Sequence, residues 1–412
     1  MAEYAKQLVK EEVTILPEGN VVTPKGFTAG GVHCGIRKSK LDFGWIYSQV
    51  PAATAGVYTT NAFQAAPLKV TQESISTGCK IQALLVNSGV ANACTGEQGL
   101  NDAYEMRKWG AEAFGVLESH TAVASTGLIG ELLPMEKIKQ GIDQIHQQEN
   151  NHVSRFERAI LTTDTREKGT AVQIEIEGKT IAIGGAAKGS GMIHPNMATM
   201  LSFITTDADV DASALSAALK NITNKSFNMI TVDGDTSTND MVLAMANGTA
   251  GNSPLDEDHP EWHLFEKGLA IVCENLAKEI ARDGEGATKL VEVHVTGAET
   301  DQAAQAISKS VISSNLVKTA IHGADANWGR LITAIGYSGQ PVNPDKVSIS
   351  IGSVKVVNEG MPVAFDEAEA KSHLMQDTVI IFADMGAGSG EAIAWGCDLS
   401  YDYVRINASY RT

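Results

Sequence analysis

The sequence predicts an α+β protein in which helices cover antiparallel sheets. Some segments alternate apolar and polar residues, which is typical of paired strands, and others repeat apolar residues at helical spacing. The two kinds of segment do not alternate strictly, as they would in a doubly wound parallel sheet. A chain of 412 residues with 43% hydrophobic residues can bury a large core without disulfide bonds or a structural metal.

The strand predictions rest on patterns with a period of two. Residues 171–184 alternate on both sides of a Glu-Gly-Lys turn, as a β-hairpin does. Similar patterns predict hairpins at 347–358 and 376–398. Single strands are expected at 43–48, 81–87, 201–206 and 290–296.

The helix predictions rest on apolar residues that recur every three or four positions. Asp211 is a suitable N-cap for one of these helices. Pro134 suits the first position of another, because the N–H that proline lacks has no helical partner there. The expected helices span 101–116, 135–147, 211–224, 261–282, 299–312 and 365–374.

Composition argues against several partners and locations. A net charge of −17 opposes binding to nucleic acid or to an anionic membrane surface. The chain has no apolar run of roughly 18 residues, and its N-terminus lacks the basic and apolar regions of a secretory signal. We therefore expect a cytoplasmic protein with reduced thiols, since its cysteines are widely spaced. They are Cys34, Cys79, Cys94, Cys273 and Cys397.

Several familiar motifs are incomplete. The stretch 184–190 places Lys188 before a glycine, whereas a phosphate-binding loop needs Gly-Lys-Ser/Thr. The acidic stretch 233–240 resembles the start of a calcium loop, but Thr238 stands where glycine is required, so we expect a solvated turn. The histidines lack the spacing of a metal site, and we expect neither a metal nor a bound cofactor.

The stretch 184–206 has the arrangement that a self-cleaving precursor needs. His194-Pro195-Asn196 predicts a turn, and Ala198 and Thr199 follow directly before an apolar strand. The Thr199 hydroxyl could attack the carbonyl of Ala198, and hydrolysis of the ester would make Thr199 a new N-terminus. Its α-amino group, with an ordinary pKa of roughly 7.7–8.0, would then act as general base. By pattern alone, a structural threonine at a strand start is the commoner interpretation.

A resemblance to a known family favours the self-cleaving interpretation of Thr199 over the structural one. AAKGSGMIHPNMATML at 186–201 strongly resembles the cleavage-site segment of the ornithine acetyltransferase (glutamate N-acetyltransferase) family. The agreement extends along nearly the whole chain. It includes NSGVANACTG at 87–96, STGLIGE at 125–131, TTDT at 162–165, TVDGDTSTND at 231–240, DGEGATK at 283–289, HGADANWGR at 322–330 and INASYRT at 406–412. The resemblance implies a layered helix/sheet/sheet/helix sandwich, shared with self-processing aminopeptidases.

The resemblance also implies processing and an activity. The chain would cut itself between Ala198 and Thr199 into an α chain, 1–198, and a β chain, 199–412, which stay together, two of each. It would move an acetyl group from N-acetylornithine to glutamate in arginine biosynthesis, releasing ornithine and forming N-acetylglutamate. Thr199 would carry the acetyl group in a ping-pong reaction. Acetyl-CoA would be a second acetyl donor in a bifunctional member.

The resemblance assigns roles to individual residues. Thr199 is the expected nucleophile, and Thr126 and Gly127 are the expected oxyanion hole. The expected substrate-binding residues are Thr162, Lys188, Thr199, Glu285, Asn407 and Thr412. Structural interpretations stand beside these: a strand end for Thr126 and Gly127, a surface lysine for Lys188, a turn carboxylate for Glu285 and a frayed terminus for Thr412. His194 is expected to be a loop residue.

Two other functions remain open from the residues. A self-processing aminopeptidase or amidohydrolase on the same fold would share the nucleophile but release its acyl group to water. A scaffold or binding module would require that the chain stay whole.

Overall fold

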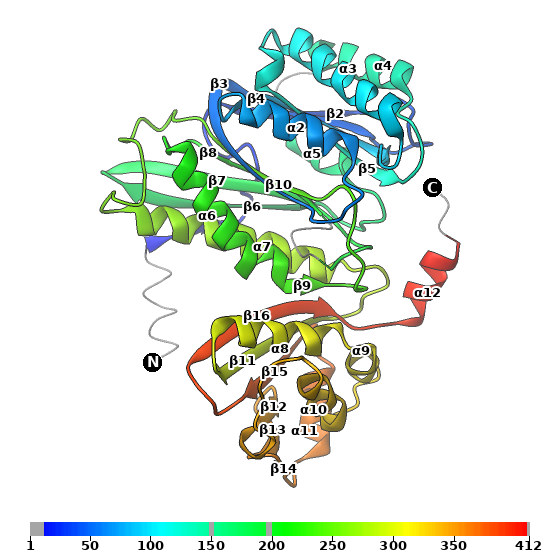
Figure 1. Ribbon diagram of the computed structural model, residues 1–412, viewed down its shortest axis with the longest axis vertical. Coiled ribbons are helices and arrows are strands. Elements are labelled where there is room, and N and C mark those ends of the chain that lie inside the picture. The colour runs from blue at the N-terminus through cyan, green and yellow to red at the C-terminus, as the bar shows by residue number, and fades with distance from the viewer. Residues whose placement is uncertain (1–11, 148–151, 195–199, 410–412) are drawn as a thin grey trace.

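The computed structural model describes residues 12–147, 152–194 and 200–409, which form an upper and a lower lobe (Figure 1). The upper lobe holds a nine-stranded sheet and the lower lobe a seven-stranded sheet, each with helices packed against it. This mixture of sheets and packed helices confirms the predicted α+β class.

The nine-stranded sheet contains most of the strands predicted as isolated segments. Its order is β1-β6-β7-β8-β10-β3-β4-β5, with β2 beside the first half of β3. The predicted hairpin at 171–184 is β6 and β7, which turn at Glu177 and Gly178. The strands are β1 (Thr14–Leu16), β2 (Phe27–Val32), β3 (Phe43–Tyr58), β4 (Lys80–Val90), β5 (Thr121–Leu128), β6 (Lys168–Ile176), β7 (Lys179–Lys188), β8 (Leu201–Thr206) and β10 (Met241–Ala246).

Strand β3 folds this sheet into two layers. Its first half pairs with β2 and β4 and its second half with β10, and its ladder with β4 is interrupted between Tyr47 and Ala52. One buried core joins both layers, with Leu84 from β4, Phe203 from β8 and Leu243 from β10. Neighbouring residues on these strands point to the opposite faces, because side chains alternate along a strand.

Helices cover both outer faces, which completes the helix, sheet, sheet, helix order (Figure 1). Helices α2 and α3 pack on β5 with α4 against α3, and α6 and α7 pack on the other layer. Helix α5 packs on β2, and its Phe156 meets Phe203 edge-on with ring centroids 5.8 Å apart. These helices are α2 (Ala66–Ser76), α3 (Gly96–Phe114), α4 (Met135–Asp143), α5 (Val153–Ala159), α6 (Ala212–Lys225) and α7 (Trp262–Arg282).

The helix-end predictions are mostly right. The Asp211 side chain caps α6 by accepting from the backbone N–H groups of Ser213 and Ala214. Pro134 is the N-cap of α4 and not its first helical residue, and the helix predicted to reach residue 147 ends at Asp143, followed by a 3-10 turn. The difference of one residue at Pro134 is typical of helix ends, but the difference of four residues at the other end is a real break, which the 3-10 turn marks.

The lower lobe overturns one predicted hairpin. The predicted hairpin at 347–358 forms as β12 and β13. The segment 376–398 forms two strands, β15 and β16, but β11 lies between them and pairs with both. The pattern within 376–398 could not reveal a third strand that comes from far earlier in the chain. The strands are β9 (Ile230–Thr231), β11 (Leu290–Ala298), β12 (Ser348–Ile351), β13 (Val354–Asn358), β14 (Met361–Pro362), β15 (Thr378–Asp384) and β16 (Gly390–Cys397).

Helices accompany the seven-stranded sheet as well. Helix α8 packs on β11 and β16, and α10 packs on α8. The predicted helices 299–312 and 365–374 correspond to α8 and α11. The helices are α8 (Asp301–Ser313), α9 (Asn315–His322), α10 (Trp328–Gly336), α11 (Glu367–Leu374) and α12 (Tyr401–Ala408).

The pattern predicted antiparallel sheets, but both sheets are mixed. Strand pairs β4–β5, β8–β10, β11–β15 and β9–β16 run parallel. Strands β5 and β10 were not predicted, because nearly all of their residues are buried and small or apolar, which removes the alternation that marks a half-exposed strand. Strand β5 carries Thr126 and Gly127 of the candidate site, and Asp240, the residue directly before β10, borders it too.

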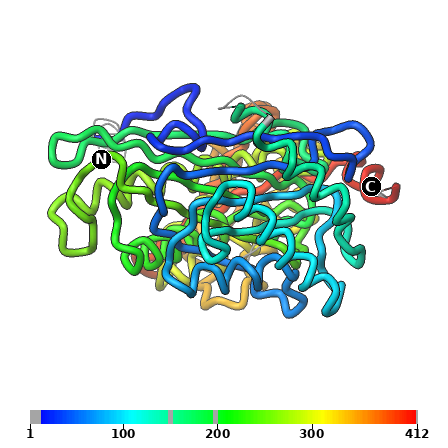
Figure 2. Tube along the Cα trace, turned by 90° about the horizontal axis from the view of Figure 1, so that it is seen from above, coloured from blue at the N-terminus to red at the C-terminus, as the bar shows by residue number. Residues whose placement is uncertain are grey.

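Position 199 does not separate two folding units. Strands β7 and β8 lie on either side of it in sequence and are antiparallel neighbours, with Lys188 opposite Leu201. A cut between Ala198 and Thr199 would therefore leave two fragments that share one sheet. The β6–β7 turn and helix α12 lie on opposite sides of the molecule in both views (Figures 1 and 2). Of the helices described, none has the length and apolarity to span a bilayer.

Candidate active site

A small cavity of about 150 Å³ lies where β5 and β7 end and β8 begins. Every predicted site residue that the structure describes borders it. These residues are Thr126, Gly127, Thr162, Lys188, Glu285 and Asn407. They come from separate segments on both sides of position 199, so only the fold brings them together.

The predicted oxyanion-hole residues lie at the end of β5. Thr126 and Gly127 pair with Ser88 and Gly89 in the parallel ladder with β4. Gly127 has a φ of 136°, and a Cβ atom at this position would collide with the Gly89 carbonyl group. Only glycine lets the two strands approach so closely. Gly127 therefore presents bare backbone to the cavity.

Substituting Gly127 tests this close approach. We expect Gly127→Ala to lower the free energy of unfolding by about 2–4 kcal/mol, from overpacking and an unfavourable φ. Gly130→Ala is the matched control, since Gly130 also has a positive φ but open space around it, and it should cost only about 1–2 kcal/mol. Urea unfolding of both variants measures the difference. Equal losses would contradict the packing argument.

Lys188 is a buried cation and not the surface lysine of the structural interpretation. It is the last residue of β7 and is 7% exposed. Its Nζ donates to Thr162 Oγ1 at 2.9 Å and to Thr126 Oγ1 at 3.2 Å. A hydroxyl that accepts from an ammonium can still donate its own proton. Lys188 thus links a predicted oxyanion-hole residue to a predicted substrate-binding residue.

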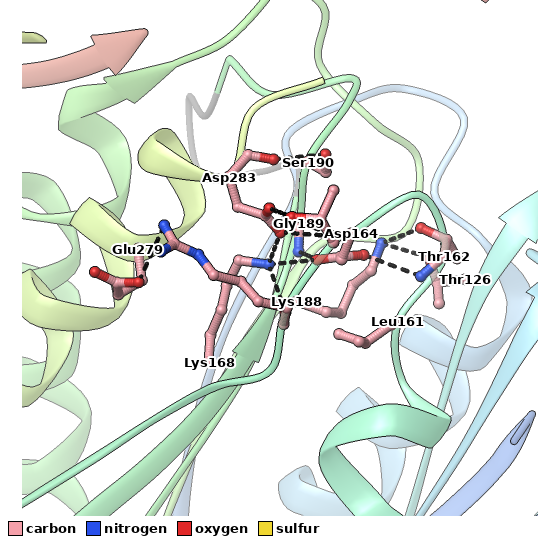
Figure 3. A network of polar contacts seen from close by, with 12 residues as sticks. Thr126, Leu161, Thr162, Asp164, Lys168, Lys188, Gly189, Ser190, Glu279 and Asp283 are labelled. Carbon is pink, nitrogen blue, oxygen red and sulfur yellow. Dashed lines mark hydrogen bonds and ion pairs between the residues drawn. The ribbon is translucent and has the colours of Figure 1, made fainter. Parts of the chain in front are cut away.

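A buried chain of charges runs behind Lys188 (Figure 3). Asp164 accepts hydrogen bonds from Lys168 Nζ at 2.8 Å, from the Gly189 N–H at 2.6 Å and from the Thr162 N–H at 2.9 Å. Lys168 also pairs with Asp283 at 2.5 Å, and both side chains are almost fully buried. Water is excluded here, so these charges act on one another strongly.

The pKa values in this chain follow from burial and charge. Burial alone would raise the pKa of Asp164, but the charges of Lys188 and Lys168 outweigh it and hold that pKa below its ordinary range. Burial lowers the pKa of Lys188, and the Lys168 charge acts in the same direction. The carboxylates of Asp164, Asp240 and Glu285 oppose that fall.

Glu285 also lines the cavity and is held beside the segment that follows Lys188. Its N–H donates to the Ser190 carbonyl at 2.9 Å, and its carboxyl group receives a hydrogen bond from Asn407 Nδ2 at 2.7 Å. A Cβ atom at Gly191 would overlap this carboxyl group, so glycine there makes room for it. Glu285 is 8% exposed, which is unlike an ordinary turn carboxylate.

The acidic stretch 233–240 is a solvated turn only in its first half, where Gly234 and Asp235 are exposed; its second half is buried, contrary to the prediction. Thr238, Asn239 and Asp240 are buried, and Asn239 and Asp240 border the cavity. Asn239 Nδ2 donates to the Ala91 carbonyl at 2.6 Å and to the Ser125 carbonyl at 2.8 Å. In this second half, hydrogen bonds to the backbone around β4 and β5 replace the solvation that the composition suggested.

Ala198, Thr199 and Thr412 lie outside the described residues. Met200, the next residue after Thr199, borders the cavity, and Leu201 does so too. Helix α12 ends at Ala408 and brings Asn407 to the cavity from the C-terminal side.

His194 lies away from the cavity, as a loop residue would. Its Nδ1 is 3.0 Å from Thr231 Oγ1, and burial together with the Lys309 charge lowers its pKa to about 4. It borders a separate, larger cleft of about 1060 Å³ between α6, α7 and α8, which none of the other predicted site residues borders. Among the described residues, no cluster of His, Cys, Asp and Glu could hold a metal ion.

Sequence reasoning missed the residues that support the site. Asp164, Lys168, Asp283, Asn239 and Asp240 received no role. Asp164, Asp283 and the Asn239-Asp240 pair stand inside the motifs TTDT, DGEGATK and TVDGDTSTND, so the signal was present. The motifs did not show that these residues are buried, since an acidic residue in a Gly- or Thr-rich stretch is usually solvated.

The layered fold and its cavity define a class of protein: an α+β sandwich in which a buried lysine faces carboxylates where its two sheet layers meet. A family model described as the ArgJ family matches residues 28–412. The chain belongs to the ArgJ family.

Close relatives span nearly the whole chain. The arginine biosynthesis bifunctional protein ArgJ of Oceanobacillus iheyensis is 60% identical over 402 residues, which is 98% of each chain. The protein of the same name from Geobacillus kaustophilus is 59% identical over 402 residues, 97% of this chain and 98% of its own. A crystal structure of ArgJ from Bacillus halodurans has 57% identity and a TM-score of 0.51, and the whole of that solved chain covers 52% of this one.

Proposed function

We propose that this chain is a self-processing acetyltransferase of arginine biosynthesis that moves an acetyl group from N-acetylornithine to glutamate. One observation carries the proposal: residues from β5, β7, the 283–286 loop and α12 meet in one cavity, directly beside Met200. Membership in the ArgJ family and relatives named for arginine biosynthesis support the same activity.

Processing would create the catalytic group. The Thr199 hydroxyl attacks the Ala198 carbonyl, the peptide becomes an ester, and water releases Thr199 as a new N-terminus. Its free amine then takes the hydroxyl proton when the hydroxyl attacks a substrate. The length of the solved Bacillus halodurans chain supports this step, since residues 199–412 would also make up 52% of this chain.

Acetyl transfer then proceeds in two halves. The Thr199 oxygen attacks the acetyl carbonyl of N-acetylornithine, and the Gly127 N–H together with Thr126 stabilises the resulting oxyanion. The carbon–nitrogen bond breaks, and ornithine leaves with the proton that the Thr199 amine had taken. The glutamate amine attacks the acetyl ester and gives up a proton, and the Thr199 hydroxyl is restored.

The charges of the cavity suit these substrates. N-acetylornithine carries a carboxylate and an ammonium, and glutamate carries an amine and two carboxylates. Lys188 and Thr162 would hold the carboxylate next to the reacting group. Glu285, with Asn407 on its carboxyl group, would face the substrate ammonium or the new amine of Thr199.

Assembly and location follow as further parts of the proposal. The two fragments share the β7–β8 ladder, which supports their staying together as α and β chains, and we propose two of each in the assembly. Three cysteines are buried free thiols, which supports a reducing, cytoplasmic location. Relatives named bifunctional support a second activity, for which we propose acetyl-CoA as donor.

The kinetic pattern is the test of this function. We expect intact mass to give two fragments and initial rates at several glutamate concentrations to give parallel lines, because the acetyl group rests on the enzyme between substrates. Labelled ornithine should exchange into N-acetylornithine without glutamate. Intersecting lines without such exchange would mean direct transfer. Acetate release that glutamate does not compete with would instead identify a self-processing amidohydrolase.

A further inference from the structure

Asp164 holds the backbone on both sides of the Lys188 ammonium (Figure 3). One oxygen of its carboxyl group accepts the Gly189 N–H, directly after Lys188, and the other accepts the Thr162 N–H. Thr162 in turn accepts a hydrogen bond from Lys188 Nζ through its hydroxyl. One carboxylate therefore sets the positions of both the cation and the hydroxyl that meet in the cavity.

Lys168 connects this carboxylate to the segment that carries Glu285. Its Nζ lies between Asp164 and Asp283, at 2.8 and 2.5 Å from their oxygens. The Asp283 carbonyl accepts from Ser190 Oγ at 2.7 Å, and the Ser190 carbonyl accepts the Glu285 N–H. The buried charges thus tie together the segments that carry Lys188 and Glu285.

Because Asp164 and Lys168 are buried, their charges act strongly on Lys188. The side chains of Lys168 and Asp164 are 0% exposed, so neither is screened by water. The ionisable groups that act on Lys188 are Asp164, Lys168, Asp240 and Glu285. Of these, Lys168 is the only cation, and its charge disfavours the ammonium form of Lys188, while Asp164 favours it.

We propose that Asp164 is a positioning residue of the acetyl-transfer site, which fixes Lys188 and Thr162 for the substrate carboxylate and serves as counter-charge to Lys188, and that Lys168 limits that counter-charge. This inference rests on the proposed function. Neither residue borders the cavity, so neither contacts substrate. Their effect reaches the substrate through Lys188.

Two substitutions should act in opposite directions. Asp164→Asn removes a negative charge beside Lys188, so Lys188 loses its proton at lower pH, and the alkaline limb of the kcat/KM profile shifts to lower pH. Lys168→Met removes a positive charge, so the same limb shifts to higher pH. We also expect Asp164→Asn to raise KM for N-acetylornithine about tenfold with a smaller change in kcat. Ionisation of the substrate itself is common to all variants and cancels.

Asp207→Asn is the matched control. Asp207 is buried and accepts the Lys25 and Ala182 N–H groups. It directly follows β8 and lies beside the first half of β7, whereas the cavity lies where β7 ends and β8 begins. Its loss should lower stability without moving KM or the pH profile. Intact mass and urea unfolding on each sample establish that the variants are processed and folded before kinetics are compared.

The outcomes separate this inference from the function on which it rests. Wild-type protein without acetyl transfer would refute the proposed function itself. The positioning role would be overturned if the wild type is active but the alkaline limb of the kcat/KM profile does not move in either variant. It would also be overturned if the limb moves in the same direction in both variants. If Asp164→Asn does not fold, the test rests on the Lys168→Met variant alone. A shift of the alkaline limb of its kcat/KM profile to higher pH supports the proposal. Failure of both to fold, with Asp207→Asn folded, would mark the pair as purely structural and overturn it.

Discussion

Thr199→Ala is expected to give a single uncut chain without measurable acetyl transfer. No hydroxyl would remain to attack the Ala198 carbonyl, so the new N-terminus would not form, and no oxygen could carry the acetyl group. Removing a nucleophile typically costs on the order of 10⁴–10⁶ in turnover. Intact-mass measurement and the labelled-ornithine exchange reaction read out both losses on one sample.

Ser202→Ala is the matched control for this variant. Ser202 lies in β8, three positions after Thr199, and its buried hydroxyl has no hydrogen-bond partner among the described residues. Losing that hydroxyl should leave processing and exchange unchanged. Full exchange in an uncut Thr199→Ala chain would remove Thr199 from the mechanism, because neither hydroxyl nor free amine would be present there.

Lys188→Met should weaken the use of both substrates. Methionine fills a similar volume but removes the ammonium that Thr126 and Thr162 surround. A hydrogen bond to a charged group contributes roughly 1.5–3 kcal/mol, so kcat/KM for N-acetylornithine should fall about 10- to 150-fold. The difference should shrink at alkaline pH, because wild-type Lys188 also loses its charge there, at a pKa that burial has lowered.

Lys179→Met separates this effect from a general loss of positive charge. Lys179 begins the same strand, β7, but is exposed and donates to the Gly251 carbonyl at the far end of the sheet. It should leave kcat/KM unchanged across the pH range. A Lys188→Met enzyme with wild-type KM for both substrates would contradict a role for Lys188 in carboxylate binding.

Local patterns were sufficient for elements whose two faces differ. The β6–β7 hairpin, helix α6 with its Asp211 cap, and helix α7 all lie where alternation or helical periodicity predicted them. Strands β5 and β10 carry no such contrast, since nearly all residues on both faces of each strand are buried. The position of β11 between β15 and β16 is a choice of partner, and partners distant in sequence leave no mark on a local pattern.

The candidate site likewise has residues that the sequence named and residues that it did not. Motif resemblance alone named Thr126, Gly127, Thr162, Lys188 and Glu285, and the cavity that they share makes their predicted roles chemically coherent. Those roles remain predictions, as does the processing at Thr199. The supporting residues Asp164 and Lys168 were not named, because their significance depends on exclusion of water and not on residue type.

By itself, then, the sequence determined the α+β class, the family resemblance and the candidates for the reactive residues, because these depend on local spacing and residue chemistry. Only the tertiary structure decided that β3 bends one sheet into two layers and that Lys188 is buried between hydroxyls instead of solvated. It alone also linked Asp164 through Lys168 to Asp283. The physical reason is that burial and Coulomb interaction depend on distance in space, which the fold sets between residues far apart along the chain.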